Sequence, residues 1–365
     1  MIFLSKITLN MLFHSLQVND VRKETSDTVS VSFSIPEELS KDYHFIPGQY
    51  ITLKTIINGE DVRRAYSICS APYENELRVA IKKVPNGVFS TYANTLLKAG
   101  DVLEVMTPNG HFHSQYKPEN HKNYVGFAAG SGITPLLSII KHVLYTEKES
   151  VFTLFYGNRE VDSVIFGKQL DDLKNIYPSR FSVQYLFSQE NYGTDIFYGR
   201  INSEKLAIWE KGLFKVAQTD EYFMCGPEAM INEVKSFLSE HNVADEKIHF
   251  ELFTASGASI DHQPKKAANT TKVNANVKVI IDDEEYQFEL GSDGKDILQA
   301  GVDAGVDLPF SCKGGVCSTC KAKILEGEAE MKLNYSLLDE EIKEGYILTC
   351  QAHPTSEKLV VSFDE

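Results

Sequence analysis

The sequence has no run of about 18 apolar residues, the length that a membrane-spanning helix requires. It also has no excess of positive charge, because 36 Lys and Arg residues stand against 51 Asp and Glu residues and the formal net charge is −15. A protein that binds nucleic acid normally presents a basic face. The composition therefore predicts that the chain neither spans a membrane nor binds nucleic acid.

The sequence also has little of what marks a secreted protein. Its start, MIFLSKITLNMLF, is interrupted by Lys6, Thr8 and Asn10 and lacks a small-residue cleavage site, so we expect no signal peptide. Only six cysteines are present, and four of them lie after residue 311, whereas a disulfide framework would be distributed over the chain. Both observations predict a soluble, cytoplasmic protein.

The length of 365 residues is two or three times that of a usual domain, which predicts several domains. Negative charge is concentrated at the end of the chain, where residues 271–365 hold 19 acidic and 9 basic residues, a net charge of −10. An acidic module of this kind can attract a basic partner protein.

Residues 15–116 have the pattern of an antiparallel β-barrel. Polar and apolar residues alternate in three runs, namely Val29–Phe33, Ile51–Leu53 and Leu77–Ile81. The pair Asn58-Gly59 suits a hairpin turn between two strands. One short helix is expected over about Ser90–Lys98, with Gly100 placed to end it.

In residues 117–254, strand and helix patterns alternate, which predicts a parallel sheet with right-handed crossovers. The expected strands are Tyr124–Ala128, Val151–Tyr156, Phe181–Phe187, Tyr222–Met224 and Lys247–Phe253. The expected helices are Pro135–Leu144, Val164–Ile176 and Glu228–Leu238.

Residues 255–270 are small and polar and are interpreted as a linker, because they cannot bury enough apolar surface to fold. Residues 271–365 form a third predicted domain. It contains strands within 275–290, a helix at about 295–304, a cysteine-rich loop and a last strand at about 358–363.

The late cysteines have the spacing C-x4-C-x2-C…C, formed by Cys312, Cys317, Cys320 and Cys350. This is the spacing of plant-type [2Fe–2S] clusters, and the small residues between the first three cysteines allow backbone N–H groups to approach the sulfurs. Structural zinc is the alternative, but zinc sites usually pair two short C-x2–4-C knuckles. The pattern therefore favours an iron–sulfur cluster, with Cys69 and Cys225 outside it.

Two motifs in the barrel are suited to a flavin. Arg64-Ala65-Tyr66-Ser67 offers a guanidinium for a pyrophosphate, an aromatic face for the ring system and a hydroxyl for a ring nitrogen. Gly87-Val88-Phe89-Ser90 follows about twenty residues later and opens the predicted helix, whose N-terminus favours phosphate.

Two further motifs lie between a predicted strand and a predicted helix, where open α/β sheets bind ligands. Gly130-Ser131-Gly132-Ile133-Thr134-Pro135 differs from the G-x-G-x-x-G fingerprint, yet its glycines equally permit close approach to a pyrophosphate. Cys225-Gly226-Pro227 occupies the same kind of position at a later strand end.

Taken in order, these motifs resemble the ferredoxin-NADP reductase superfamily with a fused C-terminal plant-type ferredoxin, over nearly the whole chain from about residue 15. The resemblance implies three folds: an antiparallel flavin β-barrel, an α/β nucleotide domain with a parallel sheet, and a β-grasp (α+β) ferredoxin domain. The domain order and the stretch Tyr156-Gly157-Asn158-Arg159 are most similar to the reductase subunits of phenylacetyl-CoA epoxidases.

The resemblance also implies roles for individual residues. FAD would be held by Arg64, Tyr66, Ser67, Gly87, Val88 and Ser90, with Phe253 on the closing strand near the flavin. The nicotinamide cofactor would be held by Gly130, Gly132, Thr134, Pro135, Cys225, Gly226 and Pro227, with Arg159 at an adenosine 2′-phosphate. The residues nearest the reaction would be Ser67, Cys225 and Glu251, and the metal ligands would be Cys312, Cys317, Cys320 and Cys350.

The implied activity is electron transfer from NADPH through FAD and the [2Fe–2S] cluster to a multi-subunit diiron oxygenase, that of phenylacetyl-CoA epoxidase. NADH is possible as donor, because no second basic residue follows Ser188. Two alternatives stay open: a reductase for a Rieske ring-hydroxylating oxygenase or a lipid desaturase, and a redox-sensing module without turnover.

Overall fold

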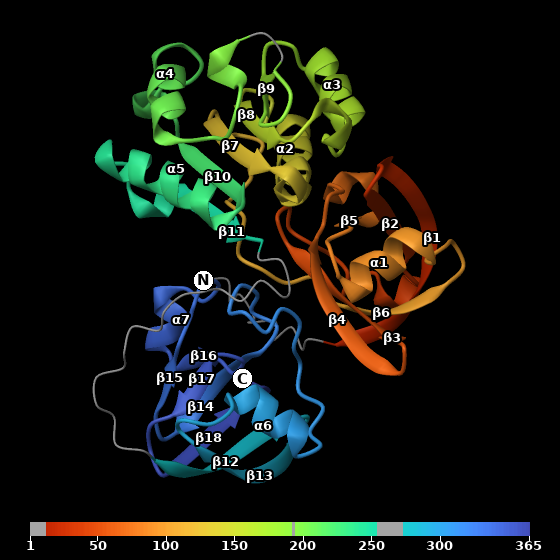
Figure 1. The fold of residues 1–365 in the computed structure, drawn as a ribbon, viewed down its shortest axis with the longest axis vertical. Coiled ribbons are helices and arrows are strands. Elements are labelled where there is room, and N and C mark those ends of the chain that lie inside the picture. Colours follow the sequence, from red (N-terminus) through yellow and green to blue (C-terminus); the bar gives the residue numbers. More distant parts are fainter. Residues whose placement is uncertain (1–11, 192–193, 254–272) are drawn as a thin grey trace. The chain divides into compact units, whose positions relative to one another are not determined.

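The computed structural model describes residues 12–191, 194–253 and 273–365, which form two compact units (Figure 1). The larger unit takes in the described residues of 14–62 and 66–255, and the smaller one those of 1–13, Arg63–Ala65 and 256–365. In these described ranges, no helix is long and apolar enough to cross a membrane.

The first part of the larger unit is a six-stranded antiparallel barrel. Its strands are β1 (Phe13–Thr25), β2 (Thr28–Ser34), β3 (Tyr50–Ile57), β4 (Glu60–Ser67), β5 (Leu77–Lys82) and β6 (Val102–Met106). They lie in the order β4-β3-β6-β1-β2-β5, and a bridge between Ile68 and Val79 links the first and last strands. Fully buried Val31, Leu53 and Val105 belong to the core that the barrel encloses.

The expected hairpin turn is confirmed, because Asn58 and Gly59 have φ values of +54° and +83° between β3 and β4. The expected helix is displaced. Helix α1 spans Val88–Thr95, because Gly87 takes the N-cap position. Gly100 does not end it: with φ of +92°, this glycine turns the chain before β6 and donates its N–H to Val18 O (2.8 Å).

The second part of the larger unit is a five-stranded parallel sheet. Its strands are β7 (Asn123–Ala129), β8 (Val151–Asn158), β9 (Phe181–Phe187), β10 (Glu221–Gly226) and β11 (Ile248–Leu252), in the order β11-β10-β7-β8-β9. Its helices are α2 (Ile133–Thr146), α3 (Gly167–Ile176), α4 (Ser203–Gly212) and α5 (Glu228–Glu240). The parallel sheet is confirmed.

Two helices of this sheet differ from expectation. Helix α3 begins at Gly167 rather than Val164, because Phe166 adopts a left-handed conformation immediately before it. Helix α4 was not predicted, because its apolar periodicity is weak. It is stabilised by an N-cap bond from Lys205 N to Asn202 Oδ1 (3.1 Å) and by burial of Trp209, which stacks on Phe155.

Strand β7 lies in the middle of the sheet, and the chain continues to β8 on one side and later to β10 on the other. This arrangement creates a topological switch point, where α/β sheets bind ligands beyond the carboxyl ends of their strands. The turn Gly130–Gly132 after β7 meets the end of β10 there. A Cβ atom on Gly132 would lie 2.0 Å from Cys225 O, so the two main chains approach in a way that requires glycine.

The smaller unit contains a mixed five-stranded sheet of β12 (Asn274–Ile281), β13 (Glu284–Gly291), β14 (Lys321–Glu326), β16 (Tyr346–Leu348) and β18 (Lys358–Ser362), in the order β13-β12-β18-β14-β16. Strands β15 (Ala329–Met331) and β17 (Ala352–Pro354) pair separately, and the helices are α6 (Ile297–Asp303) and α7 (Asp339–Lys343). The predicted strands within 275–290, the first helix and the last strand are confirmed. Helix α7 and strands β14 to β17 were not predicted, because they are short. Helix α7 has five residues, and the strands have three to six residues each.

The predicted linker at 255–270 lies outside the described residues, and the domain boundaries placed at 116/117 and 254/255 stay predictions.

The close approach at Gly132 predicts a stability difference between two glycine variants. Gly132→Ala should lower the free energy of unfolding by about 1–3 kcal/mol, because the new methyl group overlaps Cys225 O. Gly212→Ala is the control: nothing lies within 4 Å of its Cβ position at the end of α4, so stability should stay equal or rise. Urea denaturation measures both, and equal stabilities would contradict the overlap.

Candidate functional site

Three residues predicted to act at the reaction centre come together in the larger unit. Ser67 ends strand β4 of the barrel, whereas Cys225 and Glu251 lie opposite each other on the parallel strands β10 and β11. The Ser67 Oγ donates a hydrogen bond to Glu251 Oε2 at 2.9 Å. Cys225 is fully buried and Ser67 is 4% exposed. The barrel and the edge of the sheet are therefore joined by a polar contact at this point.

Burial controls the protonation of this group. It raises the pKa of Glu251 to about 7, against the lowering effect of the Ser67 hydrogen bond. Burial also raises the pKa of Cys225 well above its usual value, and the neighbouring Glu251 adds to this effect. Cys225 is thus a neutral thiol near neutral pH, while Glu251 exchanges a proton in that range. A titrating carboxyl beside a serine hydroxyl can hold and relay a proton.

The flavin motif on β4 faces the helix that carries the second flavin motif. The Tyr66 ring lies 5.6 Å from the Phe89 ring of α1, measured between centroids. Arg64 is half-buried and donates from Nη1 to Arg63 O (2.6 Å). Gly87 is the N-cap of α1, so the backbone N–H groups of Val88 and the following turn begin the helix without intrahelical acceptors. These free donors fit a phosphate.

The Ser90 hydroxyl makes two bonds to the loop that precedes α1. Its Oγ accepts a hydrogen bond from Val84 N (3.2 Å) and donates to Gly87 O (3.4 Å). A Cβ atom on Gly87 would lie 2.3 Å from Ser90 Oγ. Gly87 and Ser90 therefore shape this loop, and their binding of a pyrophosphate stays a prediction.

The predicted nicotinamide motifs border the switch point. Thr134 and Pro135 lie in the first turn of α2 and are buried, and Thr134 Oγ1 donates to Ser131 O (3.0 Å). Gly130 has φ of +54°, and nothing lies within 4 Å of its Cβ position. On the other strand, Gly226 leads into Pro227, the N-cap of α5. Open space in front of a glycine turn is what a bound dinucleotide needs.

Arg159 is exposed just after β8, at the carboxyl edge of the sheet. Its loop is tied to the end of β9 by two bonds: Gln189 N donates to Arg159 O (2.9 Å), and Val161 N donates to Glu190 Oε2 (3.0 Å). Glu190 was not predicted. No sequence pattern marked it, because its partner Val161 lies 29 residues away in the chain, in the turn after β8.

Sequence patterns also missed the contacts that set the barrel against the parallel sheet. Ser138 Oγ on α2 donates to Ser70 O in the barrel (2.6 Å), and Lys141 Nζ pairs with Glu74 Oε1 (3.0 Å). Phe253, by contrast, was predicted; it is half-buried and packs against the core of the parallel sheet.

In the smaller unit, strand pairing brings the distant fourth cysteine to the other three. Strands β14 and β16 are antiparallel, with Lys321 opposite Leu348, so Cys320 and Cys350 lie at the same end of the pair. Thr349 strengthens the junction, because its N and Oγ1 both donate to Cys320 O, at 3.1 and 2.9 Å. Gly315 and Lys313 both have positive φ values, which gives the cysteine loop its tight curve.

The four thiols are free and form two pairs. Cys317 Sγ lies 3.1 Å from Cys312 Sγ, and the Cys320 and Cys350 thiols are hydrogen-bonded to each other. The Cys317 thiol and the N–H groups of Gly314, Val316 and Cys317 lower the pKa of Cys312, which favours its thiolate. Within the described ranges, no three His, Cys, Asp or Glu side chains converge on a point that could hold one metal ion. Two thiol pairs fit the two irons of a [2Fe–2S] cluster better than a single zinc ion.

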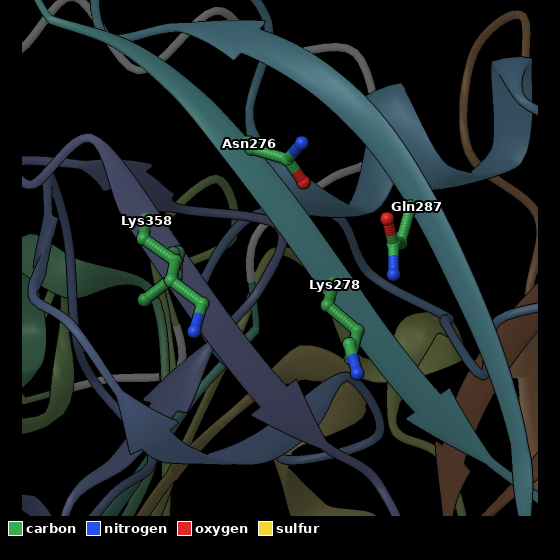
Figure 2. Close-up of a pocket in the computed structure, with 5 residues that line it drawn as sticks. Asn276, Lys278, Gln287 and Lys358 are labelled. Carbon is green, nitrogen blue, oxygen red and sulfur yellow. The ribbon is translucent and has the colours of Figure 1, made fainter.

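An open pocket of about 290 Å³ lies on the sheet of the smaller unit (Figure 2). Figure 2 shows Asn276 and Lys278 on β12, Gln287 on β13 and Lys358 on β18. Both lysines are ion-paired at 2.7 Å, Lys278 with Glu285 and Lys358 with Glu326. The pocket contains none of the predicted site residues.

Three family models match successive parts of the chain. An oxidoreductase FAD-binding domain matches residues 15–114, an oxidoreductase NAD-binding domain matches 127–236, and a 2Fe-2S iron-sulfur cluster binding domain matches 279–355. FAD, a pyridine nucleotide and a [2Fe–2S] cluster are therefore the cofactors of this chain.

Curated relatives match over almost their whole length. One of the subunits of 1,2-phenylacetyl-CoA epoxidase from Escherichia coli K12 is 43% identical over 352 residues, which cover 96% of this chain and 98% of the relative. The ferredoxin reductase component of 3-ketosteroid-9-alpha-monooxygenase from Rhodococcus rhodochrous is 32% identical over 354 residues, which cover 95% and 96%.

Solved structures have the same fold. Phthalate dioxygenase reductase matches with a TM-score of 0.57 and 24% identity, covering 96% of this chain and 98% of that one. An intact type IV self-sufficient cytochrome P450 monooxygenase matches with a TM-score of 0.67 and 22% identity, covering 96% of this chain and 41% of that one. The chain thus belongs to the family of NAD(P)H-dependent oxidoreductases in which FAD-binding, NAD-binding and [2Fe–2S] domains form the reductase component of an oxygenase.

Proposed function

We propose that this chain is the NADPH-dependent reductase of a phenylacetyl-CoA epoxidase and that its acceptor is a diiron oxygenase. The observation that carries the proposal is the 43% identity to the Escherichia coli epoxidase polypeptide over 96% of the chain. Identity to the 3-ketosteroid monooxygenase reductase is lower, at 32%. A Rieske ring-hydroxylating oxygenase or a lipid desaturase is the second candidate for the partner. A redox sensor without turnover is disfavoured, because every part of an electron-transfer chain is present.

Bound FAD would supply the conversion of a two-electron hydride transfer into one-electron transfers, and the [2Fe–2S] cluster would supply one-electron transfer to the oxygenase. The residues of this chain orient these groups. Arg64 and Tyr66 hold the flavin, with Gly87, Val88 and Ser90 shaping the loop and the helix terminus for its pyrophosphate. The ligands of the cluster are Cys312, Cys317, Cys320 and Cys350.

Two residue groups meet the nicotinamide cofactor. The turn at Gly130 and Gly132 with Thr134 and Pro135 holds its pyrophosphate at the switch point, and Arg159 contacts the 2′-phosphate. On the opposite strand end, Cys225, Gly226 and Pro227 lie beside the nicotinamide, and Phe253 closes the flavin side. Buried Cys225 excludes water, while Ser67 Oγ and Glu251 Oε2 hold the proton of the site.

The domains keep their proposed limits of 15–116, 117–254 and 271–365, with a linker at 255–270. A cytoplasmic location is part of the proposal, because thiolate ligands are kept reduced there.

Reconstitution with a purified oxygenase tests the partner. With NADPH and O₂, this chain should support epoxidation of phenylacetyl-CoA by a diiron epoxidase and should support a Rieske oxygenase poorly. Cys350→Ser should lose the cluster and the epoxidation but retain ferricyanide reduction. Cys69→Ala, which alters a buried thiol of the barrel, should retain both activities. Efficient turnover of the Rieske enzyme alone would overturn the assignment.

The Glu251 carboxyl predicts a pH dependence. Because its pKa is raised to about 7, this group is protonated below that pH and ionised above it. The NADPH–ferricyanide activity should therefore fall as the pH rises from 6 to 8, with an apparent pKa near 7, because the ionised carboxyl has no proton to relay. Glu251→Gln should abolish that step and lower the rate by about 10²-fold or more. Exposed Glu246, which precedes β11, is the control, and Glu246→Gln should leave the profile unchanged. Persistence of the step in Glu251→Gln would assign it to another group.

The position of Arg159 predicts discrimination between the nicotinamide cofactors. Arg159→Ala should raise KM for NADPH by about tenfold or more and leave KM for NADH nearly unchanged, because a guanidinium pairs a phosphate through two hydrogen bonds. Lys168→Ala removes an exposed positive charge from α3 and should change neither constant. Equal increases for both cofactors in Arg159→Ala would show that Arg159 does not read the 2′-phosphate.

A further inference from the structure

Ser311 stands directly before the first cysteine of the cluster loop and has an unsatisfied hydroxyl group. The residue is 3% exposed, and its Oγ has no hydrogen-bond partner among the described residues. A buried hydroxyl without a partner costs free energy comparable to that of a lost hydrogen bond, so native structures seldom leave one in that state.

A second residue with a hydroxyl group directly precedes the last cysteine, but its hydroxyl has a hydrogen-bond partner. Thr349 directly precedes Cys350 and is fully buried, yet its Oγ1 donates to Cys320 O at 2.9 Å. In the sequence the pairs Ser311-Cys312 and Thr349-Cys350 look alike. The structure distinguishes them, because the Thr349 hydroxyl donates to a backbone carbonyl and the Ser311 hydroxyl has no partner among the described residues.

The residue that follows Ser311 points to the group that takes this proton. It is Cys312, whose Sγ is in contact with Gly314 N (3.3 Å) and Cys317 Sγ (3.1 Å). A cluster held by Cys312 adds sulfur atoms, which carry negative charge and accept hydrogen bonds. A serine hydroxyl is a suitable donor to them.

We propose that the Ser311 hydroxyl donates a hydrogen bond to a sulfur of the [2Fe–2S] cluster and thereby raises its reduction potential. The inference rests on the proposed ligand set of four cysteines. Reduction adds one negative charge to the cluster, and a donor to sulfur stabilises that charge, so hydrogen bonds to the sulfurs raise the potential. Ser311 is thus a tuning residue that favours electron transfer from the flavin to the cluster.

Redox titration of the full chain, followed by the EPR signal of the reduced cluster, tests the proposal. Ser311→Ala should shift the midpoint potential to a more negative value, corresponding to roughly a fivefold change in the reduction equilibrium constant. Ser311→Thr retains a hydroxyl and should keep the wild-type potential. Ser362→Ala is the control: it removes a buried serine hydroxyl from β18, outside the cysteine loop, and should leave the potential near the wild-type value.

An isotope measurement gives a readout that packing alone would not change. In D₂O, the Fe–S stretching bands in the resonance Raman spectrum should shift in wild type and Ser362→Ala, and the shift should decrease in Ser311→Ala. If Ser311→Ala loses its cluster, the potentials of Ser311→Val and Ser311→Thr are compared, because these side chains have equal size and differ in the hydroxyl. An unchanged potential in the hydroxyl-free variant overturns the role of Ser311 and leaves the proposed ligand set in place. Wild-type protein without iron and sulfide overturns the ligand set as well.

Discussion

The carboxyl ends of the five parallel strands share one edge of the sheet, and the chemistry of the larger unit depends on this constraint. The chain passes from β7 to β8 on one side of the sheet and later to β10 on the other side. The glycine turn after β7 and the end of β10 therefore border the same switch point. Gly132 permits their close approach, and the next strand places Glu251 beside Cys225. Ser67 then joins the barrel to this edge through one hydrogen bond. The barrel and the parallel sheet therefore supply polar groups to the same point.

The smaller unit solves a similar problem with antiparallel pairing. Three cysteines come from one tight loop, and the register of β14 with β16 brings Cys350 to Cys320. The result is two thiol pairs, supported by backbone N–H groups around Cys312. In both units, strand register decides which side chains meet. Main-chain groups, which any residue type carries, then provide much of the polar environment.

Local patterns explain why so much could be predicted. The alternation in β2 and β5, the positive-φ pair Asn58-Gly59 and the long apolar strands of the parallel sheet are short-range signals, and the structure agrees with them. Helix α4 has weak periodicity, and β14 to β17 are too short to be recognised from alternation. Such elements form because tertiary packing stabilises them, as burial of Trp209 does for α4.

The sequence by itself determined the order of the domains and the cofactor set, because these depend on residue types at fixed spacing, and the same spacing predicts the cysteine ligands. Tertiary structure alone decided the use of each polar group. Ser90 Oγ bonds to the main chain of the loop before α1, and Glu190 ties the loop of Arg159 to the segment after β9. Ser311 and Thr349 each precede a cysteine. Strand pairing brings a carbonyl partner to the Thr349 hydroxyl, whereas the Ser311 hydroxyl has no partner among the described residues. Hydrogen bonds depend on which atoms come within about 3 Å, and residues far apart in the chain reach that distance only when the fold is complete.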